Sequence, residues 1–261
     1  MELRMDGRVA LVTGGSMGLG RAMARAFAGA GASVAILARR AAVLDEAKAE
    51  IAKTGARVER YVCDVRSAEQ IERTFKAVTA DFGRVDVLVN NAGESRVGAF
   101  ETLSDETWQS DFDLKVFAAI RFMRLALPGM RERRWGRIIN VLNTGAKAPR
   151  GGSAPTAVSR AAGLALTKIV AHEAAPHNVL VNALLTGAVI SDQWRRWHER
   201  DAPDMKFDDF VARRVKSLNV PLGRAGQAGE FAALALFLAS DAGSFISGTA
   251  INVDGGASPV W

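Results

Sequence analysis

Short apolar runs recur along the chain and are separated by longer segments of mixed polarity. Seven of these runs are rich in Val, Ile and Leu, and they cover Arg8–Thr13, Ser33–Ala38, Val58–Cys63, Val85–Asn90, Arg137–Leu142, Val179–Leu184 and Ala250–Val253. As a group they do not alternate polar with apolar residues, which is typical of strands that are covered on both faces. The pattern predicts seven buried strands.

The segments between the runs carry apolar residues at three- and four-residue spacing, as in Leu19–Ala30 and Phe231–Ala239. This spacing is typical of helices with one apolar face. Strands that alternate with helices predict right-handed βαβ units and a parallel, doubly wound sheet. We therefore expect a single α/β (Rossmann) domain over residues 1–261, built on a seven-stranded parallel sheet.

One irregular stretch, from about Ser191 to Gly226, breaks this rhythm between the sixth strand and the last helix. A long excursion at this place in a compact domain is often a lid or a binding loop, so residues 191–226 are predicted to cover the substrate. Trp194 and Trp197 would share one helix face there. With Arg196 they would suit an aromatic or carboxylate-bearing substrate. The alternative is that the helix packs its tryptophans on the body of the protein.

The composition is that of a globular protein, with 49% apolar and 24% charged residues. No apolar run is long enough for a membrane span or stands before the first strand as a secretory signal, so we expect a cytoplasmic protein. Cys63 is the only cysteine, and no residues show metal-ligand spacing. The formal net charge is +6, but the basic residues are scattered among acids. This argues against nucleic acid and favours a small anionic partner.

A glycine-rich string follows the first predicted strand and opens the first predicted helix. It reads Thr13-Gly14-Gly15-Ser16-Met17-Gly18-Leu19-Gly20. Glycine lets the chain turn tightly against a pyrophosphate, and a helix N-terminus offers free N–H groups to the phosphates. Because the string stands between a strand and a helix, it predicts a dinucleotide site that includes Gly14, Ser16, Gly18, Leu19 and Gly20.

The end of the second predicted strand bears on the choice between NAD and NADP. An NAD site needs an acidic residue there for the ribose 2′-hydroxyl. This chain has Ala38-Arg39-Arg40 instead, and a guanidinium forms charge-assisted hydrogen bonds with a 2′-phosphate. The sequence predicts NADP(H), with Arg39 at the phosphate. The alternative is that the two arginines only cap a surface turn.

These motifs resemble, in order and spacing, those of the short-chain dehydrogenase/reductase family of the short, tetrameric type. Besides the glycine string, the resemblance rests on Asp64, on Asn90-Asn91-Ala92-Gly93 and on Asn252-Val253-Asp254-Gly255-Gly256. It covers essentially the whole chain.

The resemblance implies further cofactor contacts and an assembly. The adenine would lie against Asp64 and Val65. The nicotinamide-side ribose would be lined by Asn91, Ala92 and Gly93, and the nicotinamide by Gly187, Val189 and Ser191. A homo-oligomer, either a tetramer or a dimer, would form through the predicted helices at 108–130 and 156–175.

The family's proton chemistry uses four side chains that differ here. The family has a Tyr-x-x-x-Lys pair at the start of a helix, a serine before it and an asparagine on the preceding helix. In the matching order, this chain has Thr156, Arg160, Asn143 and Lys115. Its only tyrosine, Tyr61, lies in the third predicted strand, so no shift of the alignment restores the pair.

The four replacements differ in what they can do. Thr156 is too weak an acid to pass on a proton at neutral pH without help. Arg160 stays protonated, so it can stabilise an anion or bind a ribose. Asn143 can donate an N–H to a carbonyl or an oxyanion. Lys115 can exchange a proton if burial and Arg160 lower its pKa. The alternative for Lys115 is a solvated position on a subunit-packing helix.

Three functions are compatible with this sequence. The glycine loop and the family resemblance favour an NADP(H)-dependent oxidoreductase that acts on a small carbonyl or alcohol substrate without a tyrosine. The second is a non-redox lyase or isomerase that stabilises an anion with Arg160, Lys115 and Asn143. The third is a catalytically inactive NADP(H)-binding partner subunit.

Overall fold

A seven-stranded parallel sheet forms the centre of the computed structural model, which describes residues 3–261. The strands lie in the order β3-β2-β1-β4-β6-β8-β9, and each neighbouring pair is parallel. The strand bounds are β1 Val9–Thr13, β2 Ser33–Ala38, β3 Val58–Val62, β4 Val87–Asn90, β6 Gly136–Asn143, β8 Val179–Thr186 and β9 Ala250–Val253. The predicted α/β fold with a seven-stranded parallel sheet is confirmed.

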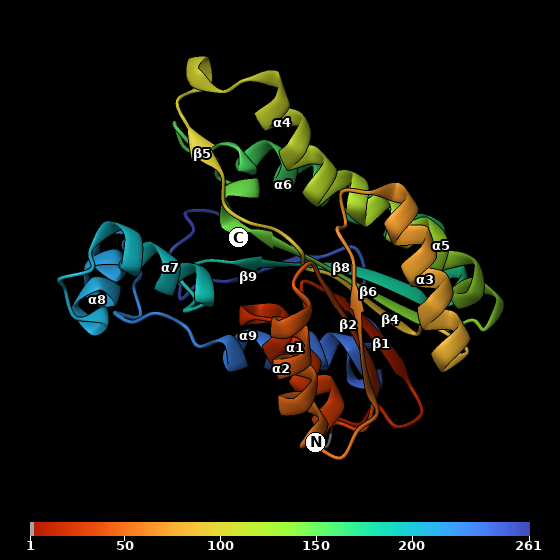
Figure 1. Ribbon diagram of the computed structural model, residues 1–261. Helices are drawn as coiled ribbons and strands as arrows, with labels where there is room; N and C mark the ends of the chain where they lie inside the picture. The colour runs from red at the N-terminus through yellow and green to blue at the C-terminus, as the bar shows by residue number, and fades with distance from the viewer. Residues whose placement is uncertain (1–2) are drawn as a thin grey trace.

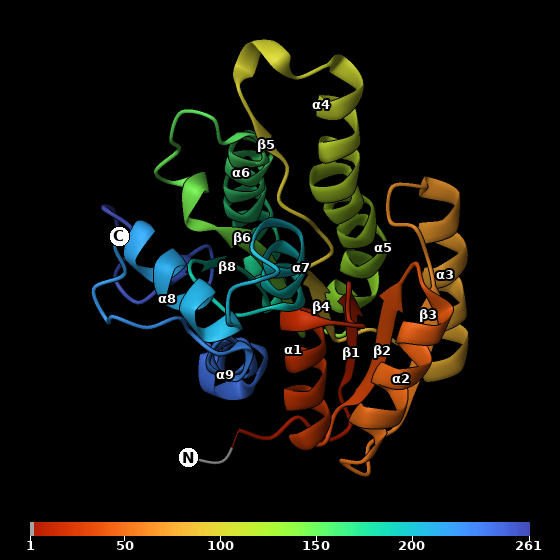
Figure 2. The same cartoon turned by 60° about the vertical axis from the view of Figure 1, so that its left-hand side comes forward.

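Helices cover both faces of this sheet, with α1, α2 and α9 on one face and α3, α5 and α6 on the other (Figures 1 and 2). The helix bounds are α1 Gly18–Gly29, α2 Ala41–Ala52, α3 Ala68–Phe82, α4 Asp105–Phe112, α5 Ala118–Glu132, α6 Thr156–Ala174, α7 Asp192–Asp201, α8 Phe207–Ser217 and α9 Ala228–Ala239. Among the helices of residues 3–261, none combines the length and the apolar character that crossing a bilayer requires.

The apolar strand residues explain the two helical layers. Successive side chains of a strand point to opposite faces of the sheet. Val12 of β1 packs in one core with Phe27 of α1, whereas Leu11 packs in the other core with Phe122 of α5. All four side chains are fully buried. Strands that are apolar on both sides therefore require a helix layer on each.

The segment predicted as one helix over 108–130 is divided in the structure. It consists of α4, a π-helical turn over Asp113–Phe117, and α5. A single π-helical turn within a helix is frequently found at a functional site. Lys115 lies in this turn.

A second, two-stranded sheet lies beside the main one and was not predicted. It pairs β5 (Val97–Gly98) with β7 (Ala154–Pro155) in antiparallel fashion. Two residues per strand are too few to produce a periodic pattern in the sequence. The pair ties the loop after β4 to the start of α6.

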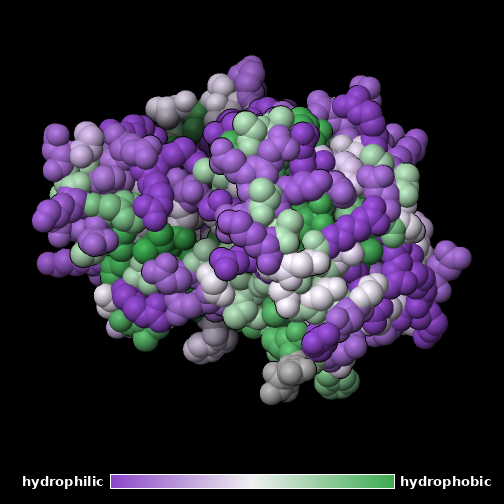
Figure 3. Space-filling model, turned by 60° about the horizontal axis from the view of Figure 1, so that its bottom comes forward, coloured by the Kyte–Doolittle hydropathy of each residue, from purple (hydrophilic) through white to green (hydrophobic). Residues whose placement is uncertain are grey.

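The stretch over 191–226 holds two helices, α7, where a helix was expected around Trp194 and Trp197, and α8, which was not predicted. The two helices form a small core of their own, in which Trp194 of α7 and Val215 of α8 are buried. They stand at one end of the molecule (Figure 1). Figure 3 shows hydrophobic residues at this end, on the left, among hydrophilic ones.

Asp86 is a buried carboxylate just before β4, at the amino end of the sheet. Its Oδ2 accepts hydrogen bonds from the N–H of Val9 (3.0 Å) and from Nε of Arg84 (2.8 Å). Asp86→Asn should lower the free energy of unfolding by about 1–3 kcal/mol, because the amide replaces a charged acceptor of buried donors. Urea titration measures this loss. A loss below about 0.5 kcal/mol, as ordinary surface substitutions give, would contradict the prediction.

Candidate active site

A long cleft opens at the carboxyl ends of β1, β4, β6 and β8. Its volume is about 500 Å³, and it runs from the glycine loop to the start of α6 and to α7. A neighbouring cavity of about 170 Å³ continues along the ends of β2 and β3. Ligands of open parallel sheets bind at this edge.

The glycine loop has no room for side chains where it turns beneath the cleft. A Cβ on Gly20 would lie 2.2 Å from the carbonyl oxygen of Gly14, and a Cβ on Gly14 would lie 2.9 Å from Nδ2 of Asn91. Asn91 holds the loop by donating from Nδ2 to the carbonyl oxygens of Thr13 and Gly14 (2.9 and 3.2 Å). The loop and the helix N-terminus behind it therefore fit the pyrophosphate of a dinucleotide.

Most of the predicted cofactor residues line the cleft or the neighbouring cavity. They are Gly14, Ser16, Gly18, Leu19, Gly20, Arg39, Asp64, Val65, Asn91, Ala92 and Gly93. Ser191 also lines the cleft.

Gly187 and Val189, which the resemblance assigns to the nicotinamide, are not among the residues that line the cleft, although the neighbouring Thr186 is. A Cβ on Gly187 would lie 2.3 Å from Cβ of Asp254, so this glycine serves close packing on the loop after β9. Val189 is buried and is paired with Gly226 in an isolated β-bridge. Both residues therefore support the cleft wall from behind.

Basic residues dominate the adenosine end of the cleft. Arg39 and Arg40 line both the cleft and the neighbouring cavity. The carboxylate of Asp64 pairs with Arg66 (Nη2 to Oδ2, 2.5 Å), and this hydrogen bond lowers the pKa of Asp64. Arg39 and Arg40, and no acidic residue, come directly after β2. This end of the cleft therefore fits an adenosine that carries a 2′-phosphate.

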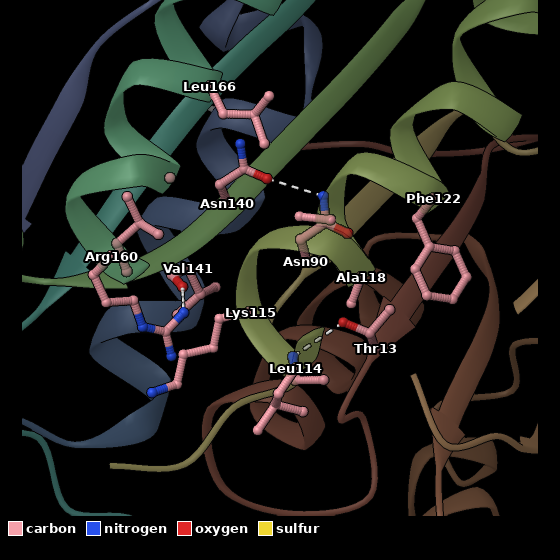
Figure 4. A pocket seen from close by; sticks show the side chains of 14 residues that line it. Thr13, Asn90, Leu114, Lys115, Ala118, Phe122, Asn140, Val141, Arg160 and Leu166 are labelled. Carbon is pink, nitrogen blue, oxygen red and sulfur yellow. Dashed lines mark hydrogen bonds between the residues drawn. The ribbon is translucent and has the colours of Figure 1, made fainter. Parts of the chain in front are cut away.

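Lys115 is buried at the bottom of the site, with 1% of its side chain exposed. Its Nζ donates a hydrogen bond to Oγ1 of Thr156 (2.8 Å) and another to the carboxylate of Asp111. Figure 4 shows Lys115 beside the guanidinium of Arg160. The alternative of a solvated lysine is therefore excluded, and three of the four residues that the sequence suggested for proton chemistry, Lys115, Thr156 and Arg160, lie together.

Burial and three charged neighbours, Arg160, Asp111 and Glu94, change the proton affinity of Lys115. Burial, and after it the positive charge of Arg160, lower the pKa of Lys115 to about 8, although Asp111 acts in the opposite direction. The sequence predicted the direction of this change. An ammonium that titrates near neutral pH can serve as a general acid or base.

Arg160 and Asn143 carry polar atoms that the protein leaves unpaired. Nη1 of Arg160 donates to the carbonyl oxygen of Val141 (2.6 Å), and a Cβ on Gly93 would lie 2.5 Å from Nη2. Nε of Arg160 and Oδ1 of Asn143 are buried without a hydrogen-bond partner among the described residues. Buried polar atoms are normally paired, so these two are exceptions among the described residues. Burial lowers the pKa of Arg160 to about 10, so it stays charged at neutral pH.

Thr156 connects Lys115 to the cleft. Its Oγ1 accepts a hydrogen bond from the N–H of Arg96 (2.9 Å) and donates one to the carbonyl oxygen of Arg96 (2.7 Å). The β5–β7 pair holds these two segments together. Thr156 lines the cleft, whereas Lys115 lies behind it. The Thr156 hydroxyl therefore offers Lys115 a hydrogen-bonded path to the cleft.

The helix α7 presents a basic residue, and not its tryptophans, to the cleft. Trp194 and Trp197 face the guanidinium of Arg214 in α8, at 5.0 and 4.5 Å from their ring centroids. Arg196 lines the cleft and forms no ion pair within residues 3–261. The two tryptophans therefore pack within the protein, as the alternative expected, and do not form a substrate-binding face.

Asp111 and Asp192 are acidic residues of the site that were not predicted from the sequence. Asp111 precedes Lys115 by four residues, a spacing that brings side chains together on a helix and that could have indicated the pair. Asp192 accepts a hydrogen bond from the N–H of Gly18 at its Oδ2 (2.6 Å), which ties α7 to the glycine loop. No local pattern announces this second contact, because the two residues are far apart in the chain.

Comparison with known proteins decides the family. A family model described as enoyl-(acyl carrier protein) reductase matches residues 14–258. The chain is also 35% identical over 255 residues to a D-beta-hydroxybutyrate dehydrogenase of Cupriavidus necator, covering 97% of this chain and 98% of the relative. The chain belongs to the short-chain dehydrogenase/reductase family.

Solved structures of this family agree closely with the fold. L-sorbose reductase from Gluconobacter frateurii, in complex with NADPH and L-sorbose, superposes with a TM-score of 0.96 at 31% identity, and each chain is covered completely. An NADPH-bound short-chain oxidoreductase from Pseudomonas aeruginosa PAO1, described as containing an atypical catalytic center, superposes with a TM-score of 0.91 at 36% identity, with 98% of each chain covered.

The cofactor end of the cleft can be tested by charge reversal. Arg39→Asp should weaken NADPH binding far more than NADH binding, because a carboxylate would repel the 2′-phosphate. Isothermal titration calorimetry with both cofactors measures the two affinities. Arg57→Asp, at the start of β3 and away from the cleft, is the control. Tighter binding of NADH than of NADPH by the unaltered chain would contradict the assignment.

Proposed function

We propose that the chain is an NADP(H)-dependent oxidoreductase of a small carbonyl or alcohol substrate, in which Lys115 acts as acid and base in place of a tyrosine. The observation that carries this proposal is the 2.8 Å hydrogen bond from Nζ of Lys115 to Oγ1 of Thr156. The oxidoreductase relatives and the NADPH-bound members of the family support it.

The cofactor would be held along the whole cleft. The glycine loop receives the pyrophosphate, Arg39 the 2′-phosphate, and the region around Gly93 and Arg160 the nicotinamide end. When bound, NADPH supplies the hydride in reduction and NADP⁺ accepts it in oxidation. The protein must provide the proton and hold the substrate oxygen.

Lys115 and Thr156 would move this proton together. In reduction, the Thr156 hydroxyl turns from the carbonyl oxygen of Arg96 and gives its proton to the substrate oxygen. At the same time the Lys115 ammonium returns a proton to Oγ1 of Thr156 and is left as a neutral amine. Oxidation of an alcohol follows the same path in reverse. Threonine alone is too weak an acid for this step, so the buried ammonium is essential.

The substrate end of the cleft favours a carboxylate-bearing carbonyl or alcohol compound. Asn143 and the cationic Arg160 both line this end of the cleft. Arg196 of α7 also lines the cleft and forms no ion pair among the described residues. A guanidinium pairs well with a carboxylate, whereas no aromatic side chain of α7 lines the cleft.

We further propose that residues 1–261 act as one domain and that residues 191–226 form its lid. The hydrogen bond from Gly18 to Asp192 joins the lid to the loop that receives the cofactor. A homo-oligomer in the cytoplasm completes this proposal. Exposed apolar residues on the helices predicted to pack between subunits support it, among them Phe117 (40% exposed), Val158 (46%) and Ile169 (56%).

The Lys115 assignment predicts opposite pH dependences for the two directions. Reduction needs the ammonium, so its kcat should fall as pH rises through about 8, the pKa of buried Lys115. Oxidation needs the neutral amine, so its kcat should rise over the same range. Initial rates with NADPH and a panel of keto acids, aldehydes and ketones, and with NADP⁺ and the matching alcohols, measure both profiles. Profiles that are flat between pH 6 and 10 would refute the assignment.

Lys115→Met should reduce kcat at least about a hundredfold, the usual contribution of a general acid, and leave NADPH affinity unchanged. Stopped-flow rates and calorimetry separate the two effects. Lys168→Met, an exposed lysine of α6, is the control. Full turnover by Lys115→Met would exclude the lysine as proton donor. If the unaltered chain turns over no substrate but binds NADPH, the inactive partner subunit becomes the better explanation.

The oligomer can be tested directly by light scattering. The exposed apolar side chains on α6 and near α5 should hold copies of the chain together, so the measured mass should be a multiple of 27.8 kDa. Ile169→Glu should shift the mass toward that of one chain, because it places a charge in the contact. A mass of 27.8 kDa at micromolar concentration would contradict the prediction.

A further inference from the structure

Asp111 is a fully buried acid that lies beside the proton-transfer residues but does not line the cleft. It occupies the last turn of α4, just before the π-helical turn that carries Lys115. One carboxylate oxygen, Oδ1, accepts the hydrogen bond from Nζ of Lys115. The other, Oδ2, accepts a hydrogen bond from Oγ of Ser159 in α6 (2.6 Å). Both oxygens are therefore used within the protein.

The charges around this carboxylate explain why it is needed. Lys115 from the π-helical turn and Arg160 from α6 are two buried cations side by side. Asp111 is the buried acid that faces them. Glu94, on the loop after β4, acts on Lys115 from farther away, and its side chain is 42% exposed and paired with Arg96. Without Asp111 the two cations would be left with no buried counter-charge, which is strongly unfavourable.

Ser159 links the carboxylate to the helix that carries Thr156 and Arg160. Its side chain is buried, and its Oγ also lies 3.1 Å from the carbonyl oxygen of Thr156. Asp111 is thus bonded to α6 on one side and to Lys115 on the other. This arrangement fixes the distance between the ammonium and the Thr156 hydroxyl.

We propose that Asp111 is a positioning residue, which holds the Lys115 ammonium against the Thr156 hydroxyl and balances the two cations buried there. It touches neither substrate nor cofactor and acts through Lys115. The expected effect of Asp111 on turnover rests on the proposed function. Its expected effect on the pKa of Lys115 does not.

Asp111→Asn tests the proposal because it removes the charge and keeps the shape. The ammonium loses its counter-charge, so the midpoint of the pH profile of kcat should move down by about one pH unit or more. Misplacement of Nζ should lower kcat by about tenfold or more, while NADPH affinity stays unchanged. Asp86→Asn is the matched control, since it changes another buried aspartate at the amino end of the sheet, opposite the cleft. It should lower stability and leave the pH midpoint in place.

A second readout does not depend on turnover. Lys115 binds its proton less tightly in the folded chain than in the unfolded chain, where the pKa of lysine is about 10.4. Its contribution to stability therefore rises with pH from about 8 upward. Urea unfolding midpoints between pH 6 and 10 should show this rise in the unaltered chain, an earlier rise in Asp111→Asn, and none from this residue in Lys115→Met.

The outcomes are distinct. A downward shift of the pH midpoint in Asp111→Asn supports the proposal. If the unaltered chain has no turnover, the proposed function fails, and the pH dependence of urea unfolding alone decides about Asp111. An unshifted midpoint overturns the proposal, whether or not kcat falls. If Asp111→Asn does not fold, the triple variant Asp111→Asn with Lys115→Met and Arg160→Met, which removes both cations, decides. Recovery of folding supports charge balance, and failure of the triple variant to fold overturns the proposal.

Discussion

Two cations, Lys115 and Arg160, are buried next to each other at the edge of the sheet, and the arrangement around them follows from that constraint. A charge in a low-dielectric interior must find a counter-charge or hydrogen-bond acceptors. Arg160 donates a hydrogen bond to the carbonyl oxygen of Val141, and Lys115 donates hydrogen bonds to Asp111 and Thr156. The ammonium that results is held on a threonine hydroxyl, which in turn lines the cleft. A side chain that would be a poor proton donor alone thereby gains a partner that titrates near neutral pH.

The fold supplies this site in separate pieces. The ends of the parallel strands provide the glycine loop, Asn91 and Asn143, as the edge of a doubly wound sheet generally does. The short β5–β7 pair brings the backbone of Arg96 to the Thr156 hydroxyl. The π-helical turn between α4 and α5 carries Lys115 to the same place. None of these pieces is reactive alone, and their convergence is what the tertiary structure adds.

Much of this could be predicted from the sequence, because periodic apolar runs and glycine spacing reflect local rules. The strands and the order of the cofactor motifs were accessible in this way, and so were Lys115, Thr156 and Arg160 as candidates to act together. Helix phase alone did not place the Lys115 ammonium, and burial had to come from the packed structure. The role of Asp111 depends on Ser159, which lies 48 positions away. The close approach of Gly187 to Asp254 was not accessible for a similar reason, since it is a tertiary contact.

The central claim is that one lysine of this chain gives up its proton near neutral pH while it remains buried. Nuclear magnetic resonance of protein labelled with nitrogen-15 at lysine Nζ measures this directly, with Lys115→Met identifying the signal. The structure predicts that the Lys115 signal titrates near pH 8. A Lys115 signal that titrates near 10.4, as free lysine does, would contradict the account.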